Sequence, residues 1–598
     1  VVYYYPVMKR VLVLLAVFLF VAPGATACKD IIAAGDATAG DYNLLLKVRD
    51  PSRPGLQVLT MVNESYRYTY HTPWLGRDMT FTTDQKYVGV ATEGDVPPNV
   101  VKPGMALSQA GIAYGDADLP SYWRNPSPNA WDDFDWIRYA CQTATTEQQA
   151  VDMLVRAVED MHAPGVPENL FVVGPSEAYI IEGTAVHYSV QEVHGVAVRS
   201  NYPKQLWDSM ILKRLFVSPT FDSSYEGDVR RGRTVRLGSL LGVRLLSVDD
   251  SGVTVRQTPF GDRIDIAEGD GATVGFFRVN VIDAGGSTAR LHVRYRYAAW
   301  EEEISRRVQT RYGDITPHDM MAWSRLHSDD LQGMRGMCED SEKGAMVYKI
   351  PRQGYETLSM GWFAPDQCSA IYVPVHIADT AIYDAYRSGS AAQLAAQLLQ
   401  RYGHGGVTDA CHRVECVFLR ENDAVETLAG EAGNDAVADV LTTSDVEMQR
   451  QAYLMQNAFL IAEADERDAV AGAWNTSYAV TLGNLRTVMR QTSSDVDAIL
   501  VDVAASIARA RSGIAATVTG DDDAWDRYRE GKTLAGAGSY SDAMQHFIEA
   551  YDEAQAALYG DHGGGTVSET ERRNDLAAVA IGVILACIVL LVVVRRRW

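Results

Sequence analysis

CKDIIAAGDATAGDYNLLLKVRD, residues 28–50, is the stretch that decides the predicted fold. It follows a basic start at residues 8–10, an apolar run at 11–21 and the small-residue cleavage pattern ATA at 25–27. Together these features predict a secretory signal peptide over residues 1–27, of which residues 1–7 are an upstream extension. Its removal would make Cys28 the first residue of the mature chain.

A cysteine at that position carries a nucleophile and a base on one residue. The thiolate attacks carbonyl carbons, and the free α-amine, whose ordinary pKa is about 7.7–8.0, can accept the thiol proton. This pattern favours amide-bond chemistry. Two other interpretations stay open: Cys28 is lipidated, although Ala25 stands where a lipoprotein signal has Leu, or it forms a disulfide, as exported cysteines often do.

Composition limits the architecture and the partners. A chain of 598 residues exceeds one compact core, and domains of about 150 residues predict three to four units. The formal charge of −23 argues against a nucleic acid partner, because a phosphate backbone requires a basic surface.

The other end of the sequence predicts a membrane anchor. Residues 576–594 form an uncharged apolar run long enough to span a bilayer as a helix, and arginines follow at 595–597. The positive-inside rule makes residues 595–598 a cytoplasmic tail, so residues 28–575 face outward, with 560–575 as a polar tether. We therefore expect a single-pass cell-membrane protein with an extracellular catalytic part.

The cysteine count permits a free thiol at Cys28. Of the seven cysteines, Cys338 and Cys368 can pair, although sequence alone does not establish the connectivity. Cys411 and Cys416 form either a local disulfide or two buried thiols, because the segment around them offers too few ligands for a metal.

Short β-rich and turn-rich segments dominate the amino half. Strand-like runs separated by Gly, Pro or Asp occur at 30–34, 42–48, 56–62 and 87–91. A capping box at Thr145 and Gln148 precedes an amphipathic helix with apolar positions from Ala150 to Met161. Four further strands follow at 170–173, 178–182, 187–193 and 196–200. The last of these strands ends at Asn201.

Several motifs in this half follow one another in a recognisable order. Cys28 is followed by KVRD at 47–50, AGIAYGDAD at 110–118, SNYP at 200–203 and RLHSDDLQGMRGMC at 325–338. From residue 28 to about 377 the chain thereby resembles the amino-terminal-nucleophile (Ntn) cysteine hydrolases. The similar group comprises choloylglycine hydrolase, penicillin acylase, acyl-CoA:6-aminopenicillanic acid acyltransferase and cysteine dipeptidases.

This resemblance implies an α+β fold. The expected catalytic domain at 28–377 is an αββα sandwich, two stacked antiparallel sheets between helices, with a β-rich insertion at about 245–303. An α-helical region at 378–559 and one carboxyl-terminal transmembrane helix follow. Within the helical region, residues 526–558 resemble a single tetratricopeptide-like hairpin; a packed helical pair or stalk is the alternative.

The resemblance also implies the catalytic parts. Cys28 is the nucleophile, Asp50 orients its amine, and Asn201 donates to the oxyanion. The group usually has Arg where this chain has Lys47, so either Lys47 or Arg49 stabilises the thiolate or holds substrate.

Two further positions depart from the group or match it loosely. Asp116 or Asp118 stands where a side-chain amide would help to hold the oxyanion, so either backbone N–H groups do that work or Asp116 has a raised pKa. Arg233 matches a further arginine of the group. No cofactor or metal is expected.

We therefore expect a membrane-anchored extracellular amidohydrolase or peptidase that cleaves the C–N bond of a dipeptide or an N-acyl amide. The alternatives are an acyltransferase on the same site, or an inactive surface lipoprotein or binding protein. The partners are a small amide substrate and the membrane, and self-association into a homo-oligomer stays open.

Overall fold

The computed structural model describes residues 28–50, 55–72, 77–93, 104–119, 127, 130–131, 133–163, 167–209, 217–339, 343–431, 434–462, 464–479, 485–520 and 522–559. The predicted signal peptide, polar tether and membrane span lie outside these residues. Within the described part of the chain, no helix has the length and apolar character needed to cross a membrane.

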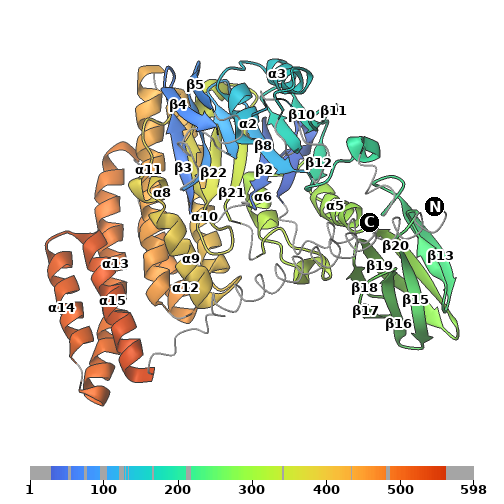
Figure 1. Ribbon diagram of the computed structural model, residues 1–598. Helices are drawn as coiled ribbons and strands as arrows, with labels where there is room; N and C mark the ends of the chain where they lie inside the picture. The colour runs from blue at the N-terminus through green and yellow to red at the C-terminus, as the bar shows by residue number, and fades with distance from the viewer. Residues whose placement is uncertain are drawn as a thin grey trace, which may run out of the picture. The chain divides into compact units, whose positions relative to one another are not determined.

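Two antiparallel sheets form the centre of the amino-terminal part of the fold (Figure 1). In order across the first sheet, its strands are β12 (Val196–Arg199), β1 (Lys29–Ala33), β2 (Tyr42–Val48), β21 (Ala345–Pro351), β22 (Met360–Ala364) and β23 (Val373–His376). The second sheet contains β11 (Tyr188–Glu192), β10 (Ala178–Gly183), β9 (Glu168–Val173), β8 (Ala113–Asp118), β7 (Met105–Ser108), β6 (Tyr87–Thr92) and β3 (Gln57–Val62). A separate hairpin joins β4 (Arg67–Thr72) and β5 (Arg77–Thr82).

The sheets are stacked, and polar as well as apolar side chains fill the space between them. In β2, Leu44, Leu46 and Val48 alternate with Asn43 and Lys47. Asn43 donates from Nδ2 to the carbonyl of Gly174 at 2.8 Å, and Lys47 contacts Asp116 of β8. Because side chains of a strand alternate between faces, the other set of β2 residues points away from the second sheet.

Helices cover the outer faces. On the seven-stranded sheet, α2 (Asp133–Cys141) and α3 (Glu147–Glu159) bury Trp136 and Leu154 against Tyr114 and Leu170. The outer face of the six-stranded sheet packs against α6 (Pro317–Ser324). Side chains of α10 (Thr408–Glu431) and α11 (Asn434–Ile461) form hydrogen bonds with strands of the same sheet. The prediction of stacked antiparallel sheets between helices is confirmed.

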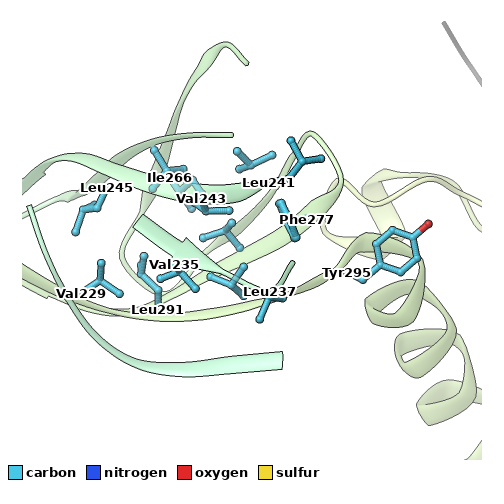
Figure 2. Close-up of a cluster of buried hydrophobic side chains, with 14 of the residues drawn as sticks. Val229, Val235, Leu237, Leu241, Val243, Leu245, Ile266, Phe277, Leu291 and Tyr295 are labelled. Atoms are coloured by element: carbon cyan, nitrogen blue, oxygen red, sulfur yellow. The ribbon is translucent and has the colours of Figure 1, made fainter. Parts of the chain in front are cut away.

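The β-rich insertion differs from its predicted limits of 245–303. It is a small sandwich of two four-stranded sheets that begins at β13 and ends at β20, and α5 (Arg296–Gln309) follows directly. One sheet is β13 (Ser224–Arg230), β20 (Thr288–Tyr295), β19 (Phe277–Gly285) and β18 (Gly271–Val274); the other is β14 (Thr234–Arg236), β15 (Gly242–Asp249), β16 (Gly252–Thr258) and β17 (Arg263–Ala267). Val243, Leu245 and Leu291 lie in the buried cluster between them (Figure 2). The start is earlier because β13 pairs with β20, a partner distant in the sequence.

The helical region divides differently from the prediction. Short α7 (Tyr355–Leu358) and α8 (Asp384–Arg387), then α9 (Ser390–Tyr402) and α12 (Ala464–Ala479), belong with the sheets to one compact unit, so the domain does not end at 377. Three single-turn helices complete it: η1 (Gly35–Ala37), η3 (Gln205–Ser209) and η4 (Asp329–Leu331).

A second unit comprises residues 461–463 and 497–598 and contains the end of α13 (Leu485–Thr519). In it, α14 (Asp523–Gly536) and α15 (Tyr540–Tyr559) form a hairpin. Gly531 permits their close approach, because a Cβ there would lie 2.6 Å from Cε1 of Phe547. The described part of this unit holds one such hairpin, so it does not form a solenoid of repeats.

Candidate active site

Cys28 lies immediately before β1, in the sheet between β12 and β2. Its side chain is buried, and its thiol forms no disulfide. Asp30 of β1 lies opposite Arg199 of β12, and continuing this antiparallel register by two positions puts Asn201 opposite Cys28. The predicted nucleophile and amide donor therefore lie just beyond the same end of the β1–β12 pair.

Lys47 is the cation that the structure places at the Cys28 thiol. Its charge lowers the pKa of that thiol, and its Nζ donates to the backbone carbonyl of Asp116. Nζ also lies 3.4 Å from Oδ1 of Asp116 and 3.7 Å from Oδ1 of Asp30. Of the two cations left open by the sequence, Lys47 thus holds the position next to the sulfur.

Arg49 points to a different partner. Its Nη1 donates to Oε1 of Gln57 at 2.7 Å, which joins β2 to the start of β3 in the other sheet. A Cβ at Gly104 would lie 2.9 Å from Nε of Arg49, so the glycine leaves the room that the guanidinium occupies.

Asp50 is buried and pairs with a residue that the sequence did not identify. Arg335 places Nη2 3.1 Å from Oδ2 of Asp50. Two residues later, the carbonyl of Met337 accepts a hydrogen bond from Nζ of Lys29 at 3.4 Å. Arg335 falls inside the motif 325–338, but only the folded chain brings it back to Asp50.

The Asn201 side chain ties the two sheets together. Its Nδ2 donates to the backbone carbonyl of Asp118, at the end of β8, at 2.8 Å. One N–H of an amide nitrogen serves that bond, and the second remains to donate elsewhere. Asn201 Oδ1 is buried and has no hydrogen-bond partner among the described residues.

Charge around Cys28 is dominated by burial and by carboxylates. Burial raises the pKa of the Cys28 thiol to about 11; Lys47 opposes this rise, whereas Asp116, Asp118 and Asp30 add to it. Burial also raises the pKa of Asp30, whose two oxygens have no hydrogen-bond partner in the described part of the chain. For Lys47, burial lowers the pKa but Asp30, Cys28 and Asp116 outweigh it, so the ammonium form is retained.

Asp116 has a role that the sequence did not suggest. Its carboxylate is an ion-pair partner of Lys47, and its side chain is mostly buried. Asp116 is therefore part of the charge arrangement that holds the cation beside the thiol.

Arg233 does not join this group. It is exposed in the turn between β13 and β14, where its carbonyl accepts from the N–H of Leu245 at 3.0 Å. The sandwich begins before this arginine and makes it part of a hairpin, and its catalytic role stays a prediction.

The remaining cysteines settle two points left open by the sequence. Cys338 and Cys368 form a disulfide, whereas Cys411 and Cys416 are two thiols. Cys28 is not a disulfide cysteine in this structure, which corrects that alternative.

No protein-family model matches the chain, and no curated protein matches it. Solved structures do match. Two variants of a conjugated bile acid hydrolase from Clostridium perfringens are 10% identical to this chain, with a TM-score of 0.32, over 58% of this chain and 92% of that one. A penicillin V acylase from Agrobacterium tumefaciens is 9% identical, with a TM-score of 0.30, over 58% of this chain and 86% of that one. The names of these proteins, a bile acid hydrolase and a penicillin acylase, fall within the group that the sequence motifs resemble.

Proposed function

We propose that this chain is an amidohydrolase of the Ntn type whose nucleophile is the Cys28 thiol. The observation that supports this function is an unbridged, buried thiol directly before β1, with Lys47 on the neighbouring strand β2 and Asn201 just after the other neighbour, β12. A sulfur nucleophile, a cation beside it and an amide donor are the groups that acyl transfer to a thiol requires.

Activation follows from removal of residues 1–27. While Cys28 is inside the chain, its nitrogen is an amide and cannot act as a base, and the thiol, with a pKa of about 11, stays protonated at neutral pH. Cleavage before Cys28 creates an α-amine, which takes the thiol proton. Lys47 then stabilises the thiolate, and Asp50, fixed by Arg335, accepts a hydrogen bond from the amine.

The reaction proceeds through a thioester. The Cys28 sulfur attacks the amide carbonyl carbon, and the second N–H of Asn201 stabilises the oxyanion. The C–N bond breaks as the α-ammonium gives its proton to the leaving nitrogen. Water then hydrolyses the thioester and releases the carboxylic acid and the free thiol. The substrate class is a dipeptide or an N-acyl amide.

The place of this reaction is the outer face of the cell membrane. This part of the proposal depends on the signal pattern at 1–27 and the apolar run at 576–594 followed by arginines. Mass analysis of the amino terminus tests both the cleavage before Cys28 and its lipidation: an unmodified Cys28 is expected as the first residue, and a fatty-acylated Cys28 would contradict the mechanism.

Activity is tested on a library of dipeptides and N-acyl amides with the processed chain and its Cys28→Ala variant. We expect turnover that Cys28→Ala abolishes and that Cys141→Ala, a change at another buried thiol, leaves in place. Adding a free amine and measuring the ratio of new amide to free acid distinguishes the two activities, since a transferase forms mainly the amide whereas a hydrolase forms mainly the acid. Equal turnover by Cys28→Ala and the unmodified chain would refute the proposal.

A further inference from the structure

Four residues from separate parts of the sequence converge near the motif 325–338. They are His327, Cys338, Cys368 and His404, and their sulfur or ring-nitrogen atoms all lie within 4.8 Å of one another. The two cysteines are buried, His327 is half-buried, and His404 is exposed. They lie in the loops around η4, between β22 and β23, and between α9 and α10.

We propose that these four residues form a tetrahedral Zn²⁺ site in the dithiol form of the protein, and that the Cys338–Cys368 disulfide is its oxidised, metal-free form. Two thiolates and two imidazoles are a ligand set that Zn²⁺ takes in structural sites.

The distances fit this geometry. Tetrahedral zinc, with bonds of about 2.3 Å to sulfur and 2.0–2.1 Å to nitrogen, separates neighbouring sulfur and nitrogen ligands by about 3.6 Å. The observed separations are 3.2 Å from Cys368 Sγ to His327 Nε2 and 3.9 Å from Cys338 Sγ to His404 Nδ1. The Cα atoms of the two cysteines are 6.9 Å apart, at the upper end of the disulfide range, so their sulfurs can separate with little backbone movement.

The backbone around the ligands is held in place. The N–H of His327 donates to Oδ2 of Asp330 at 2.9 Å, and the N–H of Cys338 donates to the carbonyl of Leu326 at 3.0 Å. These bonds fix two of the ligand residues in one tight loop before any metal binds.

The other two ligand residues are joined through a second set of bonds. The N–H of Cys368 donates to Oδ1 of Asp366 at 3.1 Å, and the carbonyl of Cys368 accepts from Oγ1 of Thr408 at 3.1 Å. Thr408 opens α10 just after His404. The ligands are therefore presented by segments that are already connected, which lowers the ordering cost of binding.

The two forms differ by two electrons. A dithiol reductant attacks the Cys338–Cys368 bond, the S–S bond breaks, and two thiols and the oxidised, cyclic disulfide of the reductant result. Binding of Zn²⁺ then releases the two thiol protons, while both imidazoles bind in the neutral form. In an oxidising compartment the disulfide form prevails, so the redox state decides whether metal binds.

Such a site would fasten the segment that supports the candidate active site. Cys338 directly follows Met337, whose carbonyl accepts from Lys29, and Arg335 of the same segment pairs with Asp50. Either the disulfide or the metal ties this segment to the β22–β23 loop.

The experiment measures zinc in the full chain, purified in detergent with a dithiol reductant. We expect one Zn²⁺ per chain, released by a disulfide oxidant, and a Co²⁺-loaded form with the visible absorption of tetrahedral, thiolate-bound cobalt. His404→Ala and Cys368→Ser should each weaken zinc affinity, measured against a chelator, by more than about 100-fold, because losing a ligand costs more than losing an outer partner. His404 is exposed, so its variant tests the site without emptying a core position.

The controls separate this site from other thiols and histidines. His318, His412 and Cys416 form another cluster, with His318 Nε2 3.2 Å from His412 Nε2. His412→Ala should retain zinc, and so should Cys28→Ala, because metal content does not depend on amide turnover. Absence of zinc from the reduced chain, unchanged affinity in His404→Ala or Cys368→Ser, or loss of zinc in His412→Ala would each overturn the inference.

Discussion

Replacing Lys47 with methionine takes away the cation that lies between Asp30 and Asp116. At the effective dielectric constant of about 20 that suits buried sites, the Coulomb attraction is about 5 kcal/mol for the 3.4 Å pair and about 4.5 kcal/mol for the 3.7 Å pair. Desolvation offsets much of this attraction, but removal of one partner strands buried carboxylates and costs about 3–5 kcal/mol. We expect Lys47→Met to lose about that much unfolding free energy at pH 7.

Urea unfolding followed by tryptophan fluorescence measures this loss, at pH 7 and at pH 5. The folded-state pKa of Asp30 is raised by burial and rises further without Lys47. Between the unfolded and folded pKa values the native state binds more protons, so the stability of Lys47→Met increases as the pH falls. The loss should therefore be smaller at pH 5 than at pH 7.

Lys343→Met is the matched control. Lys343 lies 3.1 Å from Asp366, but its side chain is 33% exposed, and such pairs contribute about 1 kcal/mol or less. If Lys47→Met costs no more than Lys343→Met, or if its cost does not change with pH, then Lys47 and its carboxylates are not a charged buried group and the account of the site is wrong.

Three further predictions concern residues around the site. In the chain that keeps residues 1–27, alkylation of Cys28 by iodoacetamide should increase up to a pH of about 11, because burial raises the thiol pKa; a half-maximal rate near neutral pH would contradict this. Arg335→Met removes a charged hydrogen bond of about 1.5–3 kcal/mol from Asp50, so kcat/KM on an identified amide should fall by roughly 10-fold or more, and an unchanged value would argue against Asp50 as the amine acceptor. Burial raises the pKa of Glu301 from 4.5 to about 7, with Arg199 opposing the rise, so native protein binds the extra proton between these values and loses stability as the pH rises through them. Glu301→Gln should flatten that pH dependence of urea unfolding, and a curve of unchanged slope would show that Glu301 is not its source.

Much of the central fold could be predicted because its signals are local. Alternating apolar residues and turn-forming residues mark strands in the stretch before Asp50 and in the four strands that end at Asn201. The structure has strands in both places; the last of the four, β12, lies in the same sheet as β1 and β2, whereas β9, β10 and β11 lie in the other sheet. The sequence therefore predicted that Cys28 lies directly before the first strand, and the cysteine count permitted its thiol to be free, as the structure has it.

The sequence by itself determined the strand pattern, since that pattern depends on residues close together in the chain. The candidate nucleophile Cys28 and the amide of Asn201 were implied by the family resemblance and stay predictions. Only the tertiary structure decided that Lys47 is the cation that lowers the pKa of the thiol while Arg49 pairs with Gln57, because β-strand register is set by long-range pairing. It likewise decided that Arg335 returns to Asp50 and that Arg233 belongs to a distant hairpin. Contacts across such separations depend on chain closure and packing of the whole core, and no local pattern records them.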